Sequence, residues 1–415
     1  MKTVKFKDSP LGPIPQEWEV KRLGEIGEPV MCKRVLKSQT SDSGAVPFYK
    51  IGTFGDKADA YISRSLYEDF KEHYPYPRKG DVLVSAAGTI GRTVVFDGNE
   101  AYFQDSNIVW IDHDESKVLN IFLCLCYKNM RWQSEDGGII SRLYNANLKA
   151  QKIPLPPLPE QRRIAEALGE MDRLIELLDA QIVKKRHIAQ GLAHDLLGMK
   201  NEECGMRNEP IRRLPGFKGE WVKKILGSVI EFATTSIATS KIDAEKYVST
   251  DNMVPNLGGV VPNTNAVSYA SVREYKTGDI LLSNIRPYLK KMWWANWNAG
   301  CSTDVLVLRL VTDSVDSRFL YHTLSRDKFF DFVSSKAVGT KMPRGDKRVI
   351  ASFQIQVPTL AEQRAIAEVL AAADAEIAAL ETKREKYKKI KAGMMRDLLS
   401  GRVRVNEECG MGNEE

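Results

Sequence analysis

The sequence predicts an α+β protein in which two globular domains rich in short β-type runs alternate with two long helices. Two observations predict this fold. The segment LPEQRRIAEAL from Leu158 returns as LAEQRAIAEVL from Leu360 in a chain of 415 residues. After each copy, apolar residues recur at alternating steps of four and three. A near-identical segment that returns after about half of the chain indicates two copies of one unit.

An apolar seam runs along both predicted helices. Its positions are Ile164, Leu168, Met171, Ile175 and Leu178 in the first copy, and Ile366, Leu370, Ala373, Ile377 and Leu380 in the second. Each seam continues to an Asp-Leu-Leu word, at Asp195 and at Asp397. Each helix should therefore hold roughly forty residues and be about 60 Å long. Because neither helix can bury its seam alone, we expect the two to pack on each other.

The predicted order along the chain is domain, helix, domain, helix. The boundaries are 1–152 for the first domain, 153–200 for the first helical spacer, 201–213 for a linker, 214–352 for the second domain, 353–405 for the second spacer and 406–415 for a flexible tail. Short β-type runs separated by Gly, Asp and Pro fill both domains. Related words open them, EWEVKRLGEI from Glu17 and EWVKKILGSVI from Glu220. The segment IPLPPLP, Ile153 to Pro159, predicts a stiff extended linker that is not helical.

Composition limits the class of protein. A chain of 415 residues with 43% hydrophobic residues exceeds what one core usually serves, so two or more domains are expected. The net charge of +6 is compatible with a nucleic-acid partner without requiring one. The start, MKTVKFKDSPLG, lacks the apolar stretch of a signal peptide, and no run of about twenty apolar residues follows. We therefore expect a soluble, cytoplasmic protein that does not contact a membrane.

The sequence lacks the motifs of the catalytic classes considered. Adenine methyltransferases hold the flipped base with an Asn/Asp-Pro-Pro-aromatic word, but the only Pro-Pro, Pro156 and Pro157, follows a leucine in the linker. No Walker A lysine loop appears, and the six cysteines and five histidines form no zinc pattern. The word GTIGR from Gly88 favours a tight turn between strands over a phosphate cradle. The sequence therefore predicts no catalytic residue, no metal site and no cofactor in this chain.

Several words in combination resemble the specificity subunit of type I restriction-modification systems, the HsdS family. They are the Pro-rich linker before EQRRIAEAL and EQRAIAEVL, the distal Asp-Leu-Leu, GDVLVSAAGTIGR from Gly80, STDNMVP from Ser249, GDILLSNIRPYLKK from Gly278 and GTKMPR from Gly339. The resemblance covers essentially the whole chain. It implies two target recognition domains on double-stranded DNA, each a mixed α/β globular domain, and a non-catalytic subunit. It also implies that the two long helices are spacers that form an antiparallel coiled coil, so that the internal repeat has pseudo-two-fold symmetry.

The resemblance also implies the partners. Two methyltransferase subunits (HsdM) would bind S-adenosylmethionine and methylate adenine, and restriction-translocase subunits (HsdR) would use ATP and Mg. The basic stretches of the helices, Lys184 to Arg186 and Lys383 to Lys391, would then follow the phosphate backbone, dock a methyltransferase subunit, or simply be solvated. Glu160 and Glu362 complement the positive N-terminal ends of the helices, so part of their role is to start them.

DNA contacts are expected from side chains in loops at strand ends, where Lys and Arg suit phosphates and Arg, Lys, Asn or Gln suit base edges. The candidates are Lys33, Arg34, Arg92, Arg142 and Asn145 in the first domain, and Arg286, Tyr288, Lys290, Lys291, Lys341 and Arg344 in the second. Each of them has the alternative of being a solvated surface charge. Trp293, Trp294 and Trp297 alternate as strand residues do, which favours a core role over base stacking.

A two-fold protein on a duplex reads two half-sites roughly 34 Å apart. Between their shared words the two domains differ almost everywhere, so the half-sites should differ and enclose an unread spacer. Two other functions remain open at this point. One is a stand-alone coiled-coil DNA-binding regulator without enzymatic partners, and the other is a scaffold whose β-rich domains bind protein.

Overall fold

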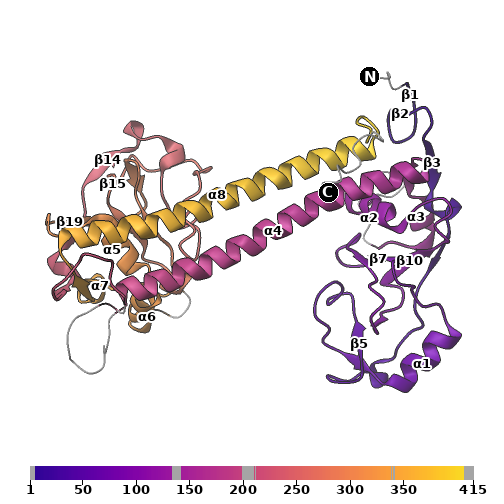
Figure 1. The fold of residues 1–415 in the computed structure, drawn as a ribbon, viewed down its shortest axis with the longest axis horizontal. Coiled ribbons are helices and arrows are strands. Elements are labelled where there is room, and N and C mark those ends of the chain that lie inside the picture. The colour runs from indigo at the N-terminus through magenta and orange to yellow at the C-terminus, as the bar shows by residue number, and fades with distance from the viewer. Residues whose placement is uncertain are drawn as a thin grey trace. The chain divides into compact units, whose positions relative to one another are not determined.

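The computed structural model describes residues 5–132, 142–198, 210, 212–337, 339 and 342–405. It divides into two compact units, Met1–Leu178 with Lys383–Glu415 and Asp179–Thr382. Each unit holds one globular domain. Two 40-residue helices, α4 (Leu158–Leu197) and α8 (Leu360–Leu399), contribute a part to each unit (Figure 1).

The first unit is an α+β domain around an antiparallel sheet with the strand order β4-β10-β7-β8. Strands β6-β5-β9 form a second sheet, and β1-β2 and β11-β3 are two-stranded. The strands are β1 (Phe6–Lys7), β2 (Ile14–Pro15), β3 (Glu19–Arg22), β4 (Glu28–Val30), β5 (Val46–Tyr49), β6 (Tyr61–Ile62), β7 (Val82–Ser85), β8 (Thr93–Val95), β9 (Tyr102–Phe103), β10 (Ile108–Asp112) and β11 (Lys152–Leu155). The helices are α1 (Arg64–His73), α2 (Asn120–Asn129) and α3 (Asn145–Ala150).

The second unit repeats the four-stranded sheet and the two-stranded β11-β3 sheet of the first. Its central sheet is antiparallel with the order β13-β19-β16-β17, beside β14-β15-β18 and the two-stranded β12-β20. The strands are β12 (Val222–Ile225), β13 (Ile230–Phe232), β14 (Ser236–Ala238), β15 (Ser271–Tyr275), β16 (Ile280–Ser283), β17 (Met292–Trp294), β18 (Ala299–Cys301), β19 (Val305–Leu310) and β20 (Gln354–Val357). The helices are α5 (Ser317–Leu324), α6 (Asp327–Ser335) and α7 (Lys347–Ala351).

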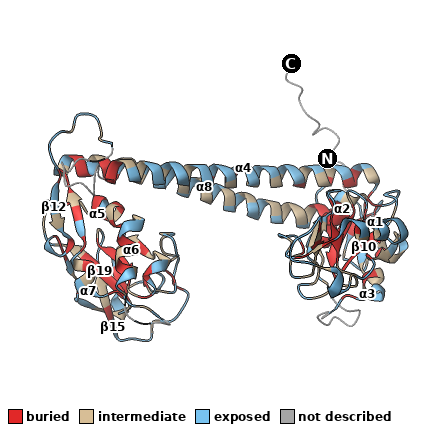
Figure 2. Cartoon of the chain, turned by 90° about the horizontal axis from the view of Figure 1, so that it is seen from below, coloured by how far each residue is buried: buried red, intermediate tan, exposed pale blue. Residues whose placement is uncertain are grey.

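Each central sheet is buried on both faces, as Figure 2 shows by the red strands inside each unit. All four residues of β7 and all four of β16 are buried, so these strands read as unbroken apolar runs rather than as alternating ones. One face of β7 packs on α2 and the start of α4, and the other packs on the small sheet that contains β5. The central strands are therefore rigid supports for the loops that follow them.

The Pro-rich segment before α4 differs from the prediction. Lys152–Leu155 is strand β11, which pairs antiparallel with β3, and the helix begins at Leu158 with Pro159 in its first turn. The prediction of a non-helical linker through Pro159 is therefore wrong at its end. A first-turn residue has no intrahelical acceptor for its N–H, so proline is tolerated there. In the second unit β12 pairs with β20 in the same way.

The predicted seam positions lie on the less exposed side of both long helices. Ile164, Leu168, Leu178, Ile366 and Leu370 are buried, and Met171, Ile175, Ala373, Ile377 and Leu380 are half-buried. In the first unit the start of α4 shares a core with Leu398 and Leu399 at the end of α8. In the second unit Leu196 and Leu197 at the end of α4 share a core with the start of α8. Within each unit the two helices therefore run antiparallel.

Charged pairs connect the helices inside each unit. Lys185 Nζ lies 2.7 Å from Glu376, and Arg186 pairs with Glu381, in the second unit. Lys391 pairs with Asp172 in the first. Part of each basic stretch is thus used between the helices rather than presented to a partner.

The Glu-Gln word at the start of each long helix joins the helix to its domain. The Gln161 side chain accepts the N–H of Leu119 (2.8 Å) and donates to the carbonyls of Lys117 and Pro156 (2.9 Å each). Gln363 makes the matching bonds with Asp316 (2.8 Å), Ser314 (3.0 Å) and Pro358 (2.9 Å). Both amides are fully buried, so the word fixes the turn that precedes α2 or α5 against the helix.

The glutamates of the same words are buried ion-pair partners. Glu160 accepts from Trp18 Nε1 (2.9 Å) and from the Arg404 guanidinium, which comes from the segment after α8. Glu362 accepts two bonds from Arg213, which comes from the segment after α4, at 2.8 and 2.6 Å. The helix-start role inferred from the sequence is therefore only part of their role, because each glutamate also ties the tail of the other long helix to its domain.

A buried histidine makes the second unit sensitive to acid. His322 on α5 is 9% exposed, Asp374 lies 3.9 Å from its Nδ1, and burial, followed by the charge of Arg318, lowers the pKa of the imidazole to about 4 from its ordinary 6.5. Asp316 acts in the opposite direction. The stabilisation from a neutral His322 is present above pH 6.5 and is lost as pH falls toward 4, because only the unfolded chain takes up the proton there.

We expect this histidine to remove on the order of 2–3 kcal/mol from the free energy of unfolding between pH 7 and pH 4. The measurement is urea unfolding of the full chain across that pH range, compared with His322→Gln, which cannot take up the proton. The variant should lose less stability over this range than the parent. Parallel pH profiles for the two proteins would contradict the expectation.

Candidate nucleic-acid interface

In both domains a loop follows the central strand and is held by equivalent backbone hydrogen bonds. In the first domain it joins β7 to β8, and the N–H of Ser85 donates to the carbonyl of Arg92 across its neck (2.9 Å). In the second domain it joins β16 to β17, and the N–H of Ser283 donates to the carbonyl of Lys291 (3.0 Å). These are loops 86–92 and 284–291. The GTIGR word thus lies in a connection between antiparallel strands, as predicted.

Two further segments flank each loop through backbone hydrogen bonds. In the first domain Ala86 N–H donates to Asn107 (2.7 Å), in the turn before β10, and Leu143 N–H, just before α3, donates to Ala86 (2.8 Å). The second domain repeats both bonds, from Asn284 to Asp304 (2.8 Å) and from Gly345 to Asn284 (3.0 Å). Each candidate site is therefore the loop, the turn before the last central strand and the residues before α3 or α7.

The first-domain candidates gather around this frame. Arg92 Nη1 donates to the carbonyl of Phe54 (2.9 Å), Arg34 Nε lies 2.8 Å from Asp105, and Arg142 Nη2 donates to Ser106 Oγ (3.1 Å). Lys33 stands 4.6 Å over the ring of Tyr74, and Asn145 is the first residue of α3. Arg34 and Arg142 thus lie on either side of the turn at residues 105–106, and both are exposed.

Some second-domain candidates bond through their side chains to other residues of the domain, and others do not. Lys291 Nζ donates to the carbonyl of Thr250 (2.6 Å), Lys290 pairs with Asp327 (2.6 Å), and Arg344 pairs with Asp304 (3.2 Å). Arg286 and Tyr288 are exposed, Tyr288 by 55%, and neither side chain makes a hydrogen bond or ion pair with the described residues. Lys341 lies outside the described residues.

Two pairs of candidates, Arg92 with Lys291 and Arg142 with Arg344, hold equivalent positions in the two domains, which sequence reasoning missed. Arg92 and Lys291 close the two loops, and each side chain donates to a backbone carbonyl of the same domain. Arg142 and Arg344 each precede the residue that donates to the loop. The words GDVLVS and GDILLS carried the signal, because counting on from them aligns Arg92 with Lys291, apart from one additional residue in the second loop.

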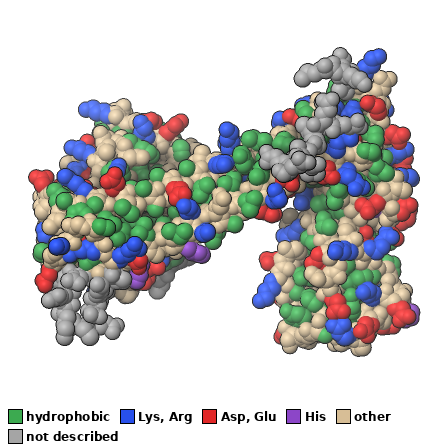
Figure 3. All heavy atoms as spheres, viewed as in Figure 1, with side chains coloured by type: hydrophobic (Ala, Val, Ile, Leu, Met, Phe, Trp, Pro, Cys, Tyr) green, Lys and Arg blue, Asp and Glu red, His purple; other side chains and the backbone are tan. Residues whose placement is uncertain are grey.

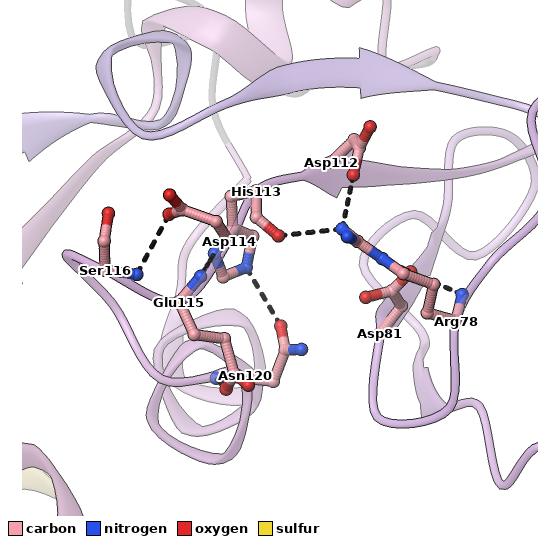
Figure 4. A network of polar contacts seen from close by, with 8 residues as sticks. All are labelled: Arg78, Asp81, Asp112, His113, Asp114, Glu115, Ser116 and Asn120. Carbon is pink, nitrogen blue, oxygen red and sulfur yellow. Dashed lines mark hydrogen bonds and ion pairs between the residues drawn. The ribbon is translucent and has the colours of Figure 1, made fainter.

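The polar residues at the far end of the central strands are structural. In the first domain Arg78 Nη2 donates to Asp112 (2.5 Å) and to the carbonyl of His113 (2.8 Å), while the buried Asp81 accepts the N–H of Arg78 (2.7 Å) (Figure 4). His113 Nε2 lies 2.9 Å from Asn120 Oδ1 at the start of α2. Figure 4 shows these side chains directed toward one another. The described residues contain no group of three or more His, Cys, Asp or Glu side chains placed to hold a metal ion.

The remaining candidates have core partners. The rings of Trp293 and Trp297 lie 4.6 Å apart and are tilted by 49°. Trp297 Nε1 donates to the Tyr275 hydroxyl (2.9 Å), and Trp294 Nε1 donates to Ser317 (3.1 Å). The four cysteines within the described residues are free and buried. No described helix has the length and apolar character needed to cross a membrane.

Charge over the surface is mixed. Figure 3 shows Lys and Arg side chains interspersed with Asp and Glu over the visible face of each unit. Recognition by these domains would therefore depend on particular loops more than on a broad basic patch.

Comparison with known proteins supplies the family. The profile of the type I restriction modification DNA specificity domain matches residues 15–185 and again 218–391. A protein of Haemophilus influenzae, provisionally named a type I restriction enzyme specificity subunit, is 58% identical over 156 residues, or 38% of this chain and 40% of that protein. The MjaVIII specificity subunit of Methanocaldococcus jannaschii is 24% identical over 418 residues, 94% of each chain.

A solved structure shares the fold. The type I restriction-modification S subunit of M. genitalium superposes with a TM-score of 0.55 at 16% identity, over 95% of this chain and 98% of that one. The two matched stretches of the specificity-domain profile fall on the two domains and the long helices that follow them. The chain therefore belongs to the type I restriction-modification DNA specificity family and is a specificity subunit with two DNA target recognition domains.

Proposed function

We propose that this subunit reads an asymmetric, bipartite DNA target, one half-site per domain, and directs adenine methylation and restriction by its partner subunits. The observation that carries the proposal is the repeated loop frame. The same backbone bonds support loops 86–92 and 284–291, yet the loops share almost no side chains. One framework with two different contact surfaces is suited to two different half-sites.

The long helices support the bipartite part of the proposal. Their antiparallel packing within each unit, with least-exposed positions at alternating steps of four and three, supports an antiparallel coiled coil. A protein with pseudo-two-fold symmetry would read half-sites a whole helical turn of the duplex apart. The spacer between them is left unread.

Partner subunits supply the chemistry in this proposal. Two HsdM subunits would bind S-adenosylmethionine and methylate adenine, and HsdR subunits would use ATP and Mg, because this chain has no catalytic word of its own. A docking surface is available on α4 in the second unit, where Val183 and Ile188 are each 52% exposed beside Lys184 and His187. An exposed apolar strip edged by basic side chains is typical of a protein interface.

The experiment that tests the proposal is adenine methylation mapping of whole genomes from cells with and without this chain, with the partner genes intact. We expect methylation at one split, asymmetric motif to disappear when the chain is removed. An unchanged methylome, in cells shown to express the chain and its partners, would favour a stand-alone DNA-binding regulator if the purified chain binds duplex with a steep salt dependence. It would favour a protein-binding scaffold if no such binding is found.

A further inference from the structure

The two loops of the candidate interface differ in which residues adopt positive φ. In loop 86–92 the residues with positive φ are Gly88 (64°) and Gly91 (84°). In loop 284–291 the corresponding positions are Arg286 and Lys290, both with φ of 51°. Gly88 and Arg286 are each the third residue after the serine that ends the strand, and Gly91 and Lys290 each precede the residue that closes the loop. Positive φ at these two positions is thus adopted by glycines in the first domain and by large cationic residues in the second.

A left-handed conformation is strained for any residue with a side chain and free of strain for glycine. Lys290 has a compensating contact, because its ammonium pairs with Asp327. Arg286 has none among the described residues, since its side chain is exposed and makes no hydrogen bond or ion pair there. The fold alone would therefore favour glycine at this position. A side chain that is kept at a strained site without an internal partner is suited to a partner outside the chain.

The backbone that carries Arg286 is held on both sides. Its own N–H donates to the carbonyl of Pro343 (2.8 Å), and Ile285 bridges to Arg344. On the other side the N–H groups of Asn256 and Leu257 donate to the carbonyls of residues 289 and 290 (2.9 Å each). Direct readout of a base edge needs a side chain presented from a rigid support, which these bonds provide.

We infer that Arg286 is the side chain with which the second domain reads a base of its half-site, a guanine by the chemistry of the guanidinium fork. This inference rests on the proposed function. Arginine donates two parallel bonds to guanine O6 and N7, whereas a phosphate contact needs only charge. Loop 86–92 has no counterpart of this side chain, because Gly88 holds the position of Arg286.

The test compares Arg286→Gly and Arg286→Lys with the parent chain, each co-expressed with its partner subunits. We expect Arg286→Gly to melt at or above the temperature of the parent, because the strain is relieved. In the methylome, one position of the second half-site should become degenerate while the first half-site is unchanged. Arg286→Lys should show the same loss, because lysine keeps the charge but not the fork. Where methylation falls below detection, binding of the purified complex to target and to unrelated duplex should show a target preference reduced by about 10- to 100-fold.

Asn256→Gly is the matched control. Asn256 is an exposed residue of the bracing segment with φ of 56°, so this variant introduces a glycine beside the same loop without touching Arg286, and it should keep the parental motif.

Three results would overturn the inference. One is an unchanged motif in Arg286→Gly, a second is an equal loss of target and unrelated binding that Arg286→Lys restores, and a third is a melting temperature below that of the parent. A parent that methylates no split motif would instead contradict the proposed function.

Discussion

Replacing Arg404 with alanine is expected to destabilise the first unit by about 3–5 kcal/mol, because the substitution leaves a buried carboxylate without its charged partner. The side chain of Glu160 is 3% exposed and that of Arg404 is 23% exposed, so solvent screens this pair little. Trp18 Nε1 would remain as a neutral donor to Glu160 (2.9 Å). The melting temperature of this unit should fall by on the order of 10 °C, measured by thermal unfolding of the full chain.

Two further variants locate the effect in the ion pair. Arg402 lies two residues earlier in the same segment and is exposed, so Arg402→Ala should melt with the parent. In the double variant Glu160→Gln with Arg404→Ala no buried charge remains, so it should recover part of the loss. Hydrogen exchange should place the loss at β3 and β11. An Arg404→Ala chain within 1 kcal/mol of the parent would show that the carboxylate is adequately satisfied by Trp18 and water.

The repeat made the architecture predictable, whereas the contacts that close each unit were not. The two EQR words and the spacing after them predicted two long helices, and the structure has them at Leu158–Leu197 and Leu360–Leu399. The partners of Glu160 and Glu362 lie 244 and 149 residues away in sequence. The repeated segment NEECGM does not mark them, because Arg213 follows its first copy whereas Arg404 precedes its second. Even the repeated Glu-Trp words diverge, because Trp18 Nε1 donates to Glu160 while Trp221 Nε1 is buried without a partner among the described residues.

The candidate site was predictable only as a set of loops. The residue types suited to DNA pointed to both loops, but the sequence gives no backbone angles, so the contrast of Gly88 with Arg286 could not be seen. Nor could it show that Arg92 and Lys291 are committed to carbonyls of their own domain. DNA contact by the individual candidates stays a prediction.

Replacing Arg309 with alanine should destabilise the second unit by about 3 kcal/mol, while Arg78→Ala should cost the first unit less than about 1 kcal/mol. Both arginines form an ion pair at the same place in the sheet, but the cation and the anion exchange positions between the two units. Ser283 pairs with Val305 and Ser85 with Ile108, so four residues further along each strand Arg309 and Asp112 hold equivalent positions. In the second unit the strand supplies the cation, and in the first it supplies the anion.

The two ion pairs differ in burial, and this difference sets the expected difference in free energy between the two substitutions. Arg309 donates to Asp279 at 3.0 and 2.7 Å, and the two side chains are only 20% and 6% exposed. Arg78 and Asp112 are 60% and 55% exposed, so water replaces most of what the first pair loses. Urea unfolding of the two variants gives both costs directly. Because Asp279 lies at the opposite end of β16 from loop 284–291, Arg309→Ala should lower stability without changing the methylated motif. Equal costs for the two variants would show that the turns at residues 78–81 and 276–279, rather than the buried pair, stabilise this end of the sheet.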